Sequence, residues 1–187
     1  MDASHSGTDK LTRGLARPAI MGAVVGAVAA VAMAMYAMIA AATYQGTGFF
    51  TPLYHIASVF IEPKTMMTSM QHGMADSTFY FVLGPAVLGA VIHMMVGAMY
   101  GAMFGIVLTF VRSSGPALVA VGAVFGAMVF VVSSWVGLPI AAAIFNSGDQ
   151  ITDMAKMVGY GTFLVEHVMF GLALGLLYLN RRVSASR

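Results

Sequence analysis

The stretch PAIMGAVVGAVAAVAMAMYAMIAAATY, residues 18–44, contains no charged side chain. An α-helix needs about 20 apolar residues to cross the hydrocarbon core of a bilayer, whereas the apolar region of a secretory signal peptide has only about 7–15. We therefore predict a membrane-spanning helix here that is retained in the mature protein. The run Ala40-Ala41-Ala42 leaves cleavage of this segment open as an alternative.

Three further apolar runs follow, at residues 79–111, 117–136 and 158–179. The chain of 187 residues is 59% hydrophobic and 9% charged, with a mean hydropathy of +0.87, so it has too little polar surface for a water-soluble globule. We predict an all-α integral membrane protein, a bundle of four transmembrane helices in a lipid bilayer. Because the second run is longer than a bilayer is thick, we expect a break at Pro85.

The basic residues predict the orientation of these helices. Only Lys64 and Lys156 lie in the connections after the first and third runs. By the positive-inside rule the other side is cytoplasmic, so we predict a protein of the plasma (inner) membrane with residues 1–17 and 181–187 in the cytoplasm. These cations form no basic face, and no nucleic-acid partner is expected. The residues on the predicted cytoplasmic side are Lys10, Arg13, Arg17, Arg112, Arg181, Arg182 and Arg187.

The two outer connections, residues 45–78 and 137–157, each contain a short apolar segment. Residues 54–60 and 140–145 are too short to cross a bilayer, so we predict interfacial or re-entrant segments. Gly137-Leu138-Pro139 is expected to interrupt the third helix.

The chain also repeats itself. Gly22-Ala23-Val24-Val25-Gly26-Ala27 recurs as Gly122-Ala123-Val124-Phe125-Gly126-Ala127, in each case a few residues after a proline. The order of matches predicts a tandem repeat of a two-helix unit, residues 18–111 and 112–180. A unit with two spans returns the chain to its starting side, so the two copies are predicted to be parallel.

The second helix of each predicted unit carries the pattern His-x3-Gly-x3-Gly. It begins at His93 in one unit and at His167 in the other, and on a helix its glycines lie about 40° and 80° from the histidine. We predict that the two imidazoles face each other in the outer half of the membrane. The glycines of the pattern are Gly97, Gly101, Gly171 and Gly175.

The histidine depths agree only approximately. Counted at about 1.5 Å per residue from the nearest cytoplasmic arginines, His93 lies roughly 28 Å and His167 roughly 21 Å from the inner boundary. The two depths therefore differ by about one helical turn.

Two facing imidazoles suggest a metal centre. Our leading hypothesis is that His93 and His167 bind haem b or a copper ion, with the glycines leaving space for a macrocycle, in a redox or accessory subunit. The first alternative is a cofactor-free assembly subunit, in which the glycines are small-residue helix interfaces and the histidines are hydrogen-bonded packing residues. The second is a small proton-linked or ion transporter.

Glu166 lies about 100° from His167 around its helix. A carboxylate at this depth must be paired, protonated or hydrated, so Glu166 is a candidate for orienting a histidine or for carrying protons. Tyr100 and Tyr178 are candidates for the same polar path, and a structural hydrogen bond of Glu166 is the alternative.

The chain contains 17 methionines. Thioether and imidazole ligands suit Cu(I), so a cluster in the first outer connection is a second candidate copper site, although methionine is also an adaptable packing residue. A methionine stripe at Met95, Met99 and Met103 lies on the face of its helix opposite His93, and we interpret it as packing. The cluster in the connection is Met66, Met67, Met70, His72 and Met74.

Several functional classes are not expected. The chain has no cysteine, which excludes disulfides and thiolate metal sites. It has no hydrolytic triad, phosphate loop, paired carboxylates or HExxH motif, so a stand-alone hydrolase or an ATP-driven pump is not expected. Other membrane subunits or further copies of the chain are the expected protein partners.

Overall fold

The four predicted spans are helices in the structure, a computed structural model. It describes residues 3–111 and 113–185, with side chains over 14–111 and 113–181. All regular secondary structure in these residues is helical. The chain is therefore an all-α protein whose four apolar helices fit a lipid bilayer. The helices long and apolar enough to span it cover Gly14–Ala42, Leu83–Phe110, Pro116–Phe145 and Tyr160–Arg181.

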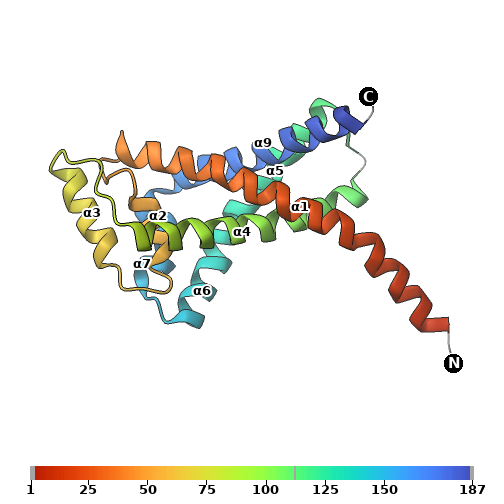
Figure 1. Ribbon diagram of the computed structural model, residues 1–187, viewed down its shortest axis with the longest axis horizontal. Helices are drawn as coiled ribbons and strands as arrows, with labels where there is room; N and C mark the ends of the chain where they lie inside the picture. The colour runs from red at the N-terminus through yellow and green to blue at the C-terminus, as the bar shows by residue number, and fades with distance from the viewer. Residues whose placement is uncertain (1–2, 112, 186–187) are drawn as a thin grey trace.

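The spanning helices pack as two pairs. Helix α1 (Ala3–Ala42) packs along α4 (Leu83–Phe110), α5 (Pro116–Val132) packs along α9 (Tyr160–Ala185), and α1 also contacts α9. Both termini lie at one end of the molecule, which we call the terminal end (Figure 1). The opposite end, the loop end, holds the four short helices α2 (Thr51–Ala57), α3 (Lys64–Met74), α7 (Asp149–Thr152) and α8 (Met154–Val158).

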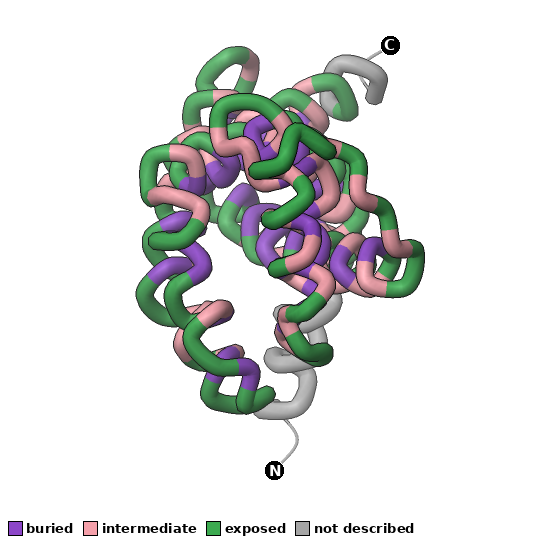
Figure 2. Tube along the Cα trace, turned by 90° about the vertical axis from the view of Figure 1, so that its left-hand side faces the viewer, coloured by how far each residue is buried: buried purple, intermediate pink, exposed green. Residues whose placement is uncertain are grey.

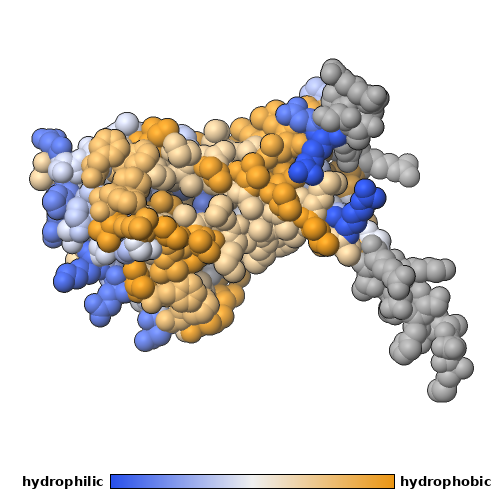
Figure 3. Space-filling model, in the orientation of Figure 1, coloured by the Kyte–Doolittle hydropathy of each residue, from blue (hydrophilic) through white to orange (hydrophobic). Residues whose placement is uncertain are grey.

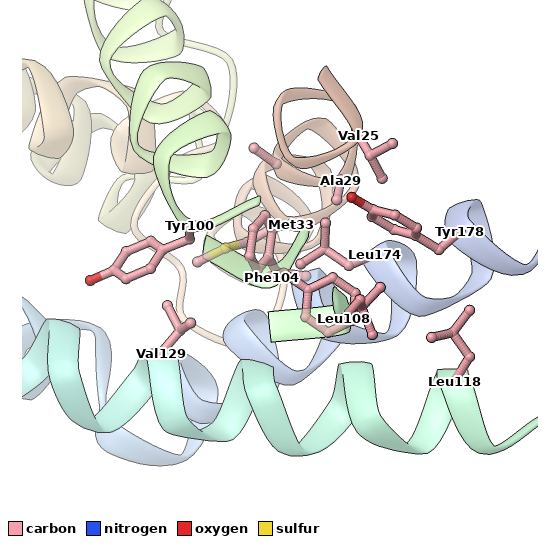
Figure 4. Close-up of a cluster of buried hydrophobic side chains, with 12 residues drawn as sticks. Val25, Ala29, Met33, Tyr100, Phe104, Leu108, Leu118, Val129, Leu174 and Tyr178 are labelled. Carbon is pink, nitrogen blue, oxygen red and sulfur yellow. The ribbon is translucent and has the colours of Figure 1, made fainter. Parts of the chain in front are cut away.

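A common core joins the two pairs. Phe104 of α4 is fully buried, and its ring packs against Phe125 of α5 and Tyr178 of α9, with ring centroids 5.0 and 5.6 Å away. Figure 4 shows side chains from all four spanning helices in this core. Along the helices, buried stretches alternate with exposed ones (Figure 2). The outside is largely apolar around the spans, as a lipid environment requires (Figure 3).

The second span begins later than predicted. Phe79 to Val82 are not helical, and α4 starts at Leu83, so Pro85 stands in the first turn and does not break the helix. The first N–H groups of any helix lack an intrahelical acceptor, so proline is tolerated there at little cost. The Tyr54 hydroxyl accepts a 2.7 Å hydrogen bond from the Val82 N–H just before the helix.

The third span continues through the predicted interruption. A π-helical turn, Ser133–Gly137, joins α5 to α6 (Leu138–Phe145), and the Leu138 N–H bonds the carbonyl of Ser133. A wide turn of this kind is a common way for a helix to accommodate an insertion or a proline such as Pro139. In Figure 1, α6 leaves the line of α5 and turns toward α7.

The first outer connection is folded against the bundle. Helix α2 packs on α4, where a side chain at Gly89 would overlap the backbone of Leu53. Hydrogen bonds also link residues 45–78 with the segment before the fourth span: Gln45 Nε2 donates to the Val158 carbonyl at 2.8 Å, and His55 Nε2 donates to the Gln150 carbonyl at 2.6 Å. The loop end is thus one packed layer.

Candidate functional site

His93 connects the two helices of the first pair. Its imidazole, on α4, is half-buried, and Nε2 lies 3.0 Å from the Ala30 carbonyl of α1. Because a carbonyl can only accept, Nε2 carries the hydrogen and Nδ1 keeps its lone pair. His93 therefore holds α4 to α1 and retains one nitrogen able to bind a proton or a metal ion.

His167 bonds within its own helix. Its side chain is buried, and Nδ1 donates a 2.7 Å hydrogen bond to the Phe163 carbonyl one turn earlier in α9. The rings of Phe163 and Phe130 lie 4.4 and 6.1 Å from the imidazole. Nε2 is the nitrogen left with a lone pair.

The two histidines are near enough to interact electrostatically. Their hydrogen bonds nevertheless differ, since His93 bonds a neighbouring helix and His167 bonds its own. Among the residues with described side chains, no group of three or more histidine or acidic residues is arranged to hold a metal ion.

The packing of the pairs offsets the two histidines by one turn. Gly22 lies against Gly101 in the first pair, and Gly122 lies against Gly171 in the second. One turn further toward the loop end, Gly26 lies against Gly97, whereas Gly126 lies against the backbone of His167. His167 thus occupies the place of Gly97, and His93 lies one turn beyond that place. This offset matches the difference in depth computed from the sequence.

The glycines beside the histidines are helix contacts. A Cβ atom on Gly97, Gly101 or Gly171 would overlap the facing helix, and one on Gly175 would overlap Leu118 and Val119. Such close approach is typical of small-residue interfaces in membranes. The facing backbones fill the space that a macrocycle would need, so a haem plane does not fit over these glycines.

Glu166 is the buried acid of the bundle. It is 5% exposed, and the nearest lysine and arginine along the sequence are Lys156 and Arg181. It lies within electrostatic reach of Tyr36 on α1. Counted from the start of the span, Glu166 is about 9 Å deep on the loop-end side.

A chain of hydroxyl groups lies at the loop end near this region. The Tyr44 hydroxyl donates to Thr162 Oγ1 at 3.1 Å and lies 3.4 Å from the Tyr36 hydroxyl. Since Tyr44 uses its hydrogen on Thr162, Tyr36 is the donor to Tyr44. Tyr44 is 64% exposed at the loop end, so the chain runs from the surface to the neighbourhood of Glu166.

Tyr100 and Tyr178 lie away from this chain. The Tyr100 hydroxyl is 3.1 Å from Ser133 Oγ at the π-helical turn. Tyr178 packs in the core beside Phe104, and its hydroxyl lies next to Gly105. Tyr100 and Tyr178, which the sequence predicted to share a polar path with Glu166, therefore do not lie beside it in the structure.

The methionine cluster of α3 is divided between two faces. Met66 is buried and Met70 packs against the same core, with Met38 and Leu53. Met67 and Met74 are exposed, and the His72 ring stacks on Tyr80 at 4.7 Å. The stripe in α4 faces outward, with exposed fractions of 67%, 52% and 49% for Met95, Met99 and Met103.

The hydroxyl chain was missed in the sequence. Tyr36 and Tyr44 are the only tyrosines of the first apolar run. Two hydroxyl groups in an otherwise apolar segment were the only sign of the chain in the sequence. Their partner Thr162 lies 118 residues after Tyr44, and no local pattern connects the two. Comparison of the chain with family models, with curated proteins and with solved structures gave no match.

Proposed function

We propose that the protein is a proton-linked transporter of the plasma (inner) membrane and that Glu166 binds and releases the proton. The observation that carries this proposal is the burial of the Glu166 carboxyl inside a membrane span, within electrostatic reach of Tyr36 in the hydroxyl chain. An ionisable side chain in this position is unfavourable for stability alone, and such residues commonly mark proton or substrate pathways.

The hydroxyl chain supports a route from the loop end. In the structure Tyr36 donates to Tyr44 and Tyr44 donates to Thr162. Inward transfer begins from the reversed donors: Tyr36 gives its proton to the Glu166 carboxylate, which becomes the neutral acid, and regains one from Tyr44, which regains one from Thr162, which takes one from the surface. Release toward the terminal end then requires a second arrangement of the helices, as in alternating access. The nearby imidazoles of His93 and His167 each have one free lone pair to receive that proton.

We also propose that the two helix pairs are copies of one duplicated unit, with the terminal end in the cytoplasm. Equivalent contacts support the duplication. Gly105 lies against Pro18 in the first pair, and Gly175 lies against Leu118 in the second. The seven cations on the side of the termini support the orientation.

Proton flux into proteoliposomes tests the proposed function. With a pH-sensitive dye inside the vesicles and an imposed membrane potential, the wild-type protein should acidify or alkalinise the lumen, and Glu166→Gln should match empty vesicles. Glu62→Gln, in an exposed loop, is the matched control. Equal behaviour of wild type, Glu166→Gln and empty vesicles would favour the cofactor-free assembly subunit, with other subunits or further copies as partners.

A copper ion bound between His93 and His167 is the second candidate function. It is favoured by the hydrogen bonds, because a metal-binding imidazole usually donates its other N–H to a carbonyl or carboxylate, as both rings do. Two imidazoles suit Cu(I). Metal analysis of protein purified after copper exposure should then find about one copper per chain in wild type and none in His93→Ala/His167→Ala.

A further inference from the structure

An apolar groove with two arginines lies at the terminal end, far from Glu166. It has a volume of about 480 Å³ and runs between α1 and the end of α9. Among residues 14–111 and 113–181, whose side chains are described, no acidic side chain lines it. Its lining residues are Ala16, Arg17, Ile20, Met21, Val24 and Arg181.

The charge of the groove selects the chemistry of its ligand. Arg17 and Arg181 are both exposed and line the same groove, where two guanidinium groups repel each other unless an anion lies between them. Guanidinium groups match the oxygens of a phosphodiester in bidentate geometry. Strongly hydrophilic side chains flank an apolar strip at this end of the molecule (Figure 3).

The apolar wall continues beyond the groove. Arg17, Ile20 and Val24 lie on one face of α1, within about 60° of one another. The same face carries an exposed apolar stripe toward the loop end, about 27 Å long from Arg17. A ligand with an anionic head at the arginines therefore has a continuous apolar track for a chain. The exposed residues of the stripe are Val28, Val31 and Met35.

We propose that this groove binds an anionic phospholipid, with its phosphodiester between Arg17 and Arg181 and an acyl chain along the stripe of α1. The groove lies at the membrane boundary, because Arg181 ends the fourth span and Arg17 lies near the start of the first. A lipid headgroup occupies the same level. A headgroup without its own positive charge is preferred, since the described lining offers two guanidinium groups and no carboxylate to pair with one.

Native mass spectrometry of the full-length protein tests the proposal. Protein in mild detergent is mixed with equal amounts of phosphatidylglycerol and phosphatidylcholine. The wild type should retain phosphatidylglycerol preferentially, and Arg17→Gln/Arg181→Gln should lower its retention about 25-fold, at about fivefold per basic residue. Lys64→Gln/Lys156→Gln, which removes two cations from the loop end, should leave retention unchanged.

Further variants and a competition with inorganic phosphate distinguish the possible reasons for a negative result. Arg17→Lys/Arg181→Lys keeps the charge but loses the forked geometry, and its retention should fall between wild type and the glutamine variant. If the glutamine variant aggregates, each single Arg→Gln change should still lower retention about fivefold. Equal preference in wild type and Arg17→Gln/Arg181→Gln would overturn the proposal. Displacement of phosphatidylglycerol by inorganic phosphate alone would show that the arginines bind free anion and would also overturn it.

Discussion

The α1–α4 pair and the α5–α9 pair bring their helices together through the same sequence of contacts and differ at one place. Gly26 meets a glycine, Gly97, in the first pair, whereas Gly126 meets the backbone of His167 in the second. The neighbour of His167 along the chain is the buried Glu166. The comparison indicates that the same kind of helix contact meets a glycine in one pair and, in the other, a histidine that stands next to a buried acid.

Overpacking the glycine contacts should have the largest effect and should break both pairs alike. Gly26→Leu and Gly126→Leu each place a side chain on a facing backbone, so each should lower the free energy of unfolding by roughly 3 kcal/mol. Thermal unfolding in detergent measures this. Gly14→Leu and Gly161→Leu, which have open space around them, should unfold like wild type. A large loss in one pair only would contradict the equivalence.

Truncation of the two histidines should destabilise the two helix pairs to different extents. His167→Ala leaves a cavity among Phe130 and Phe163 and should lower the free energy of unfolding by about 2 kcal/mol. His93→Ala removes one interhelical hydrogen bond and should lower it by only about 0.6 kcal/mol. The same unfolding assay compares them. A larger loss for His93→Ala would mean that the first pair holds the more tightly packed histidine.

The pH response of the loop end comes from the contact between the two connections. Burial lowers the pKa of His55 below its usual 6.5, against the opposing effect of its hydrogen bond to Gln150. When the contact between the two connections is broken, His55 binds a proton more tightly than it does in the intact contact. The contact is therefore fully stable above about pH 6.5 and weakens as pH falls below that value. The hydrogen-exchange protection factors of residues 51–57, which correct for slower intrinsic exchange at low pH, should fall on acidification.

His55→Gln is the variant that checks this assignment. It removes the titratable group, keeps an N–H donor for the Gln150 carbonyl and should abolish the pH dependence, at a loss of about 1 kcal/mol at neutral pH. A fall in the protection factors at low pH that persists in His55→Gln would assign the response to another group.

Removal of one hydroxyl from the chain should have the smallest effect on stability. Tyr44→Phe breaks the link between Tyr36 and Thr162 and should change the free energy of unfolding by less than about 0.5 kcal/mol, because Tyr44 is largely exposed. Proton flux in proteoliposomes should nevertheless slow. Tyr160→Phe, outside the chain, is the control, and equal flux in wild type and Tyr44→Phe would remove the chain from the route.

The spans could be predicted because length and hydropathy are local properties. The bilayer thickness sets both, so four runs of the sequence sufficed to locate four helices. The roles of Pro85 and Pro139 could not be predicted. Pro85 begins a helix and Pro139 follows a π-helical turn, and which of these happens depends on tertiary packing around the proline.

The register of the site was beyond the sequence for a different reason. His93 matches His167 residue for residue, but the contacts pair the positions of Gly97 and His167. The two copies of the histidine and glycine pattern can be aligned in two registers that differ by one helical turn. Matching identical residues selects the register that pairs His93 with His167, whereas the helix contacts use the other register. The depth difference of about one turn was the only sequence observation that pointed to the correct register.

Infrared difference spectroscopy across a pH change tests the central claim most directly, because it observes the proton on the carboxyl group itself. The wild-type protein in lipid should show a carboxylic acid C=O band that converts to a carboxylate band as pH rises, and Glu166→Gln should lack that component while Glu62→Gln keeps it. A difference spectrum identical in wild type and Glu166→Gln would show that Glu166 exchanges no proton and would contradict the proposed function.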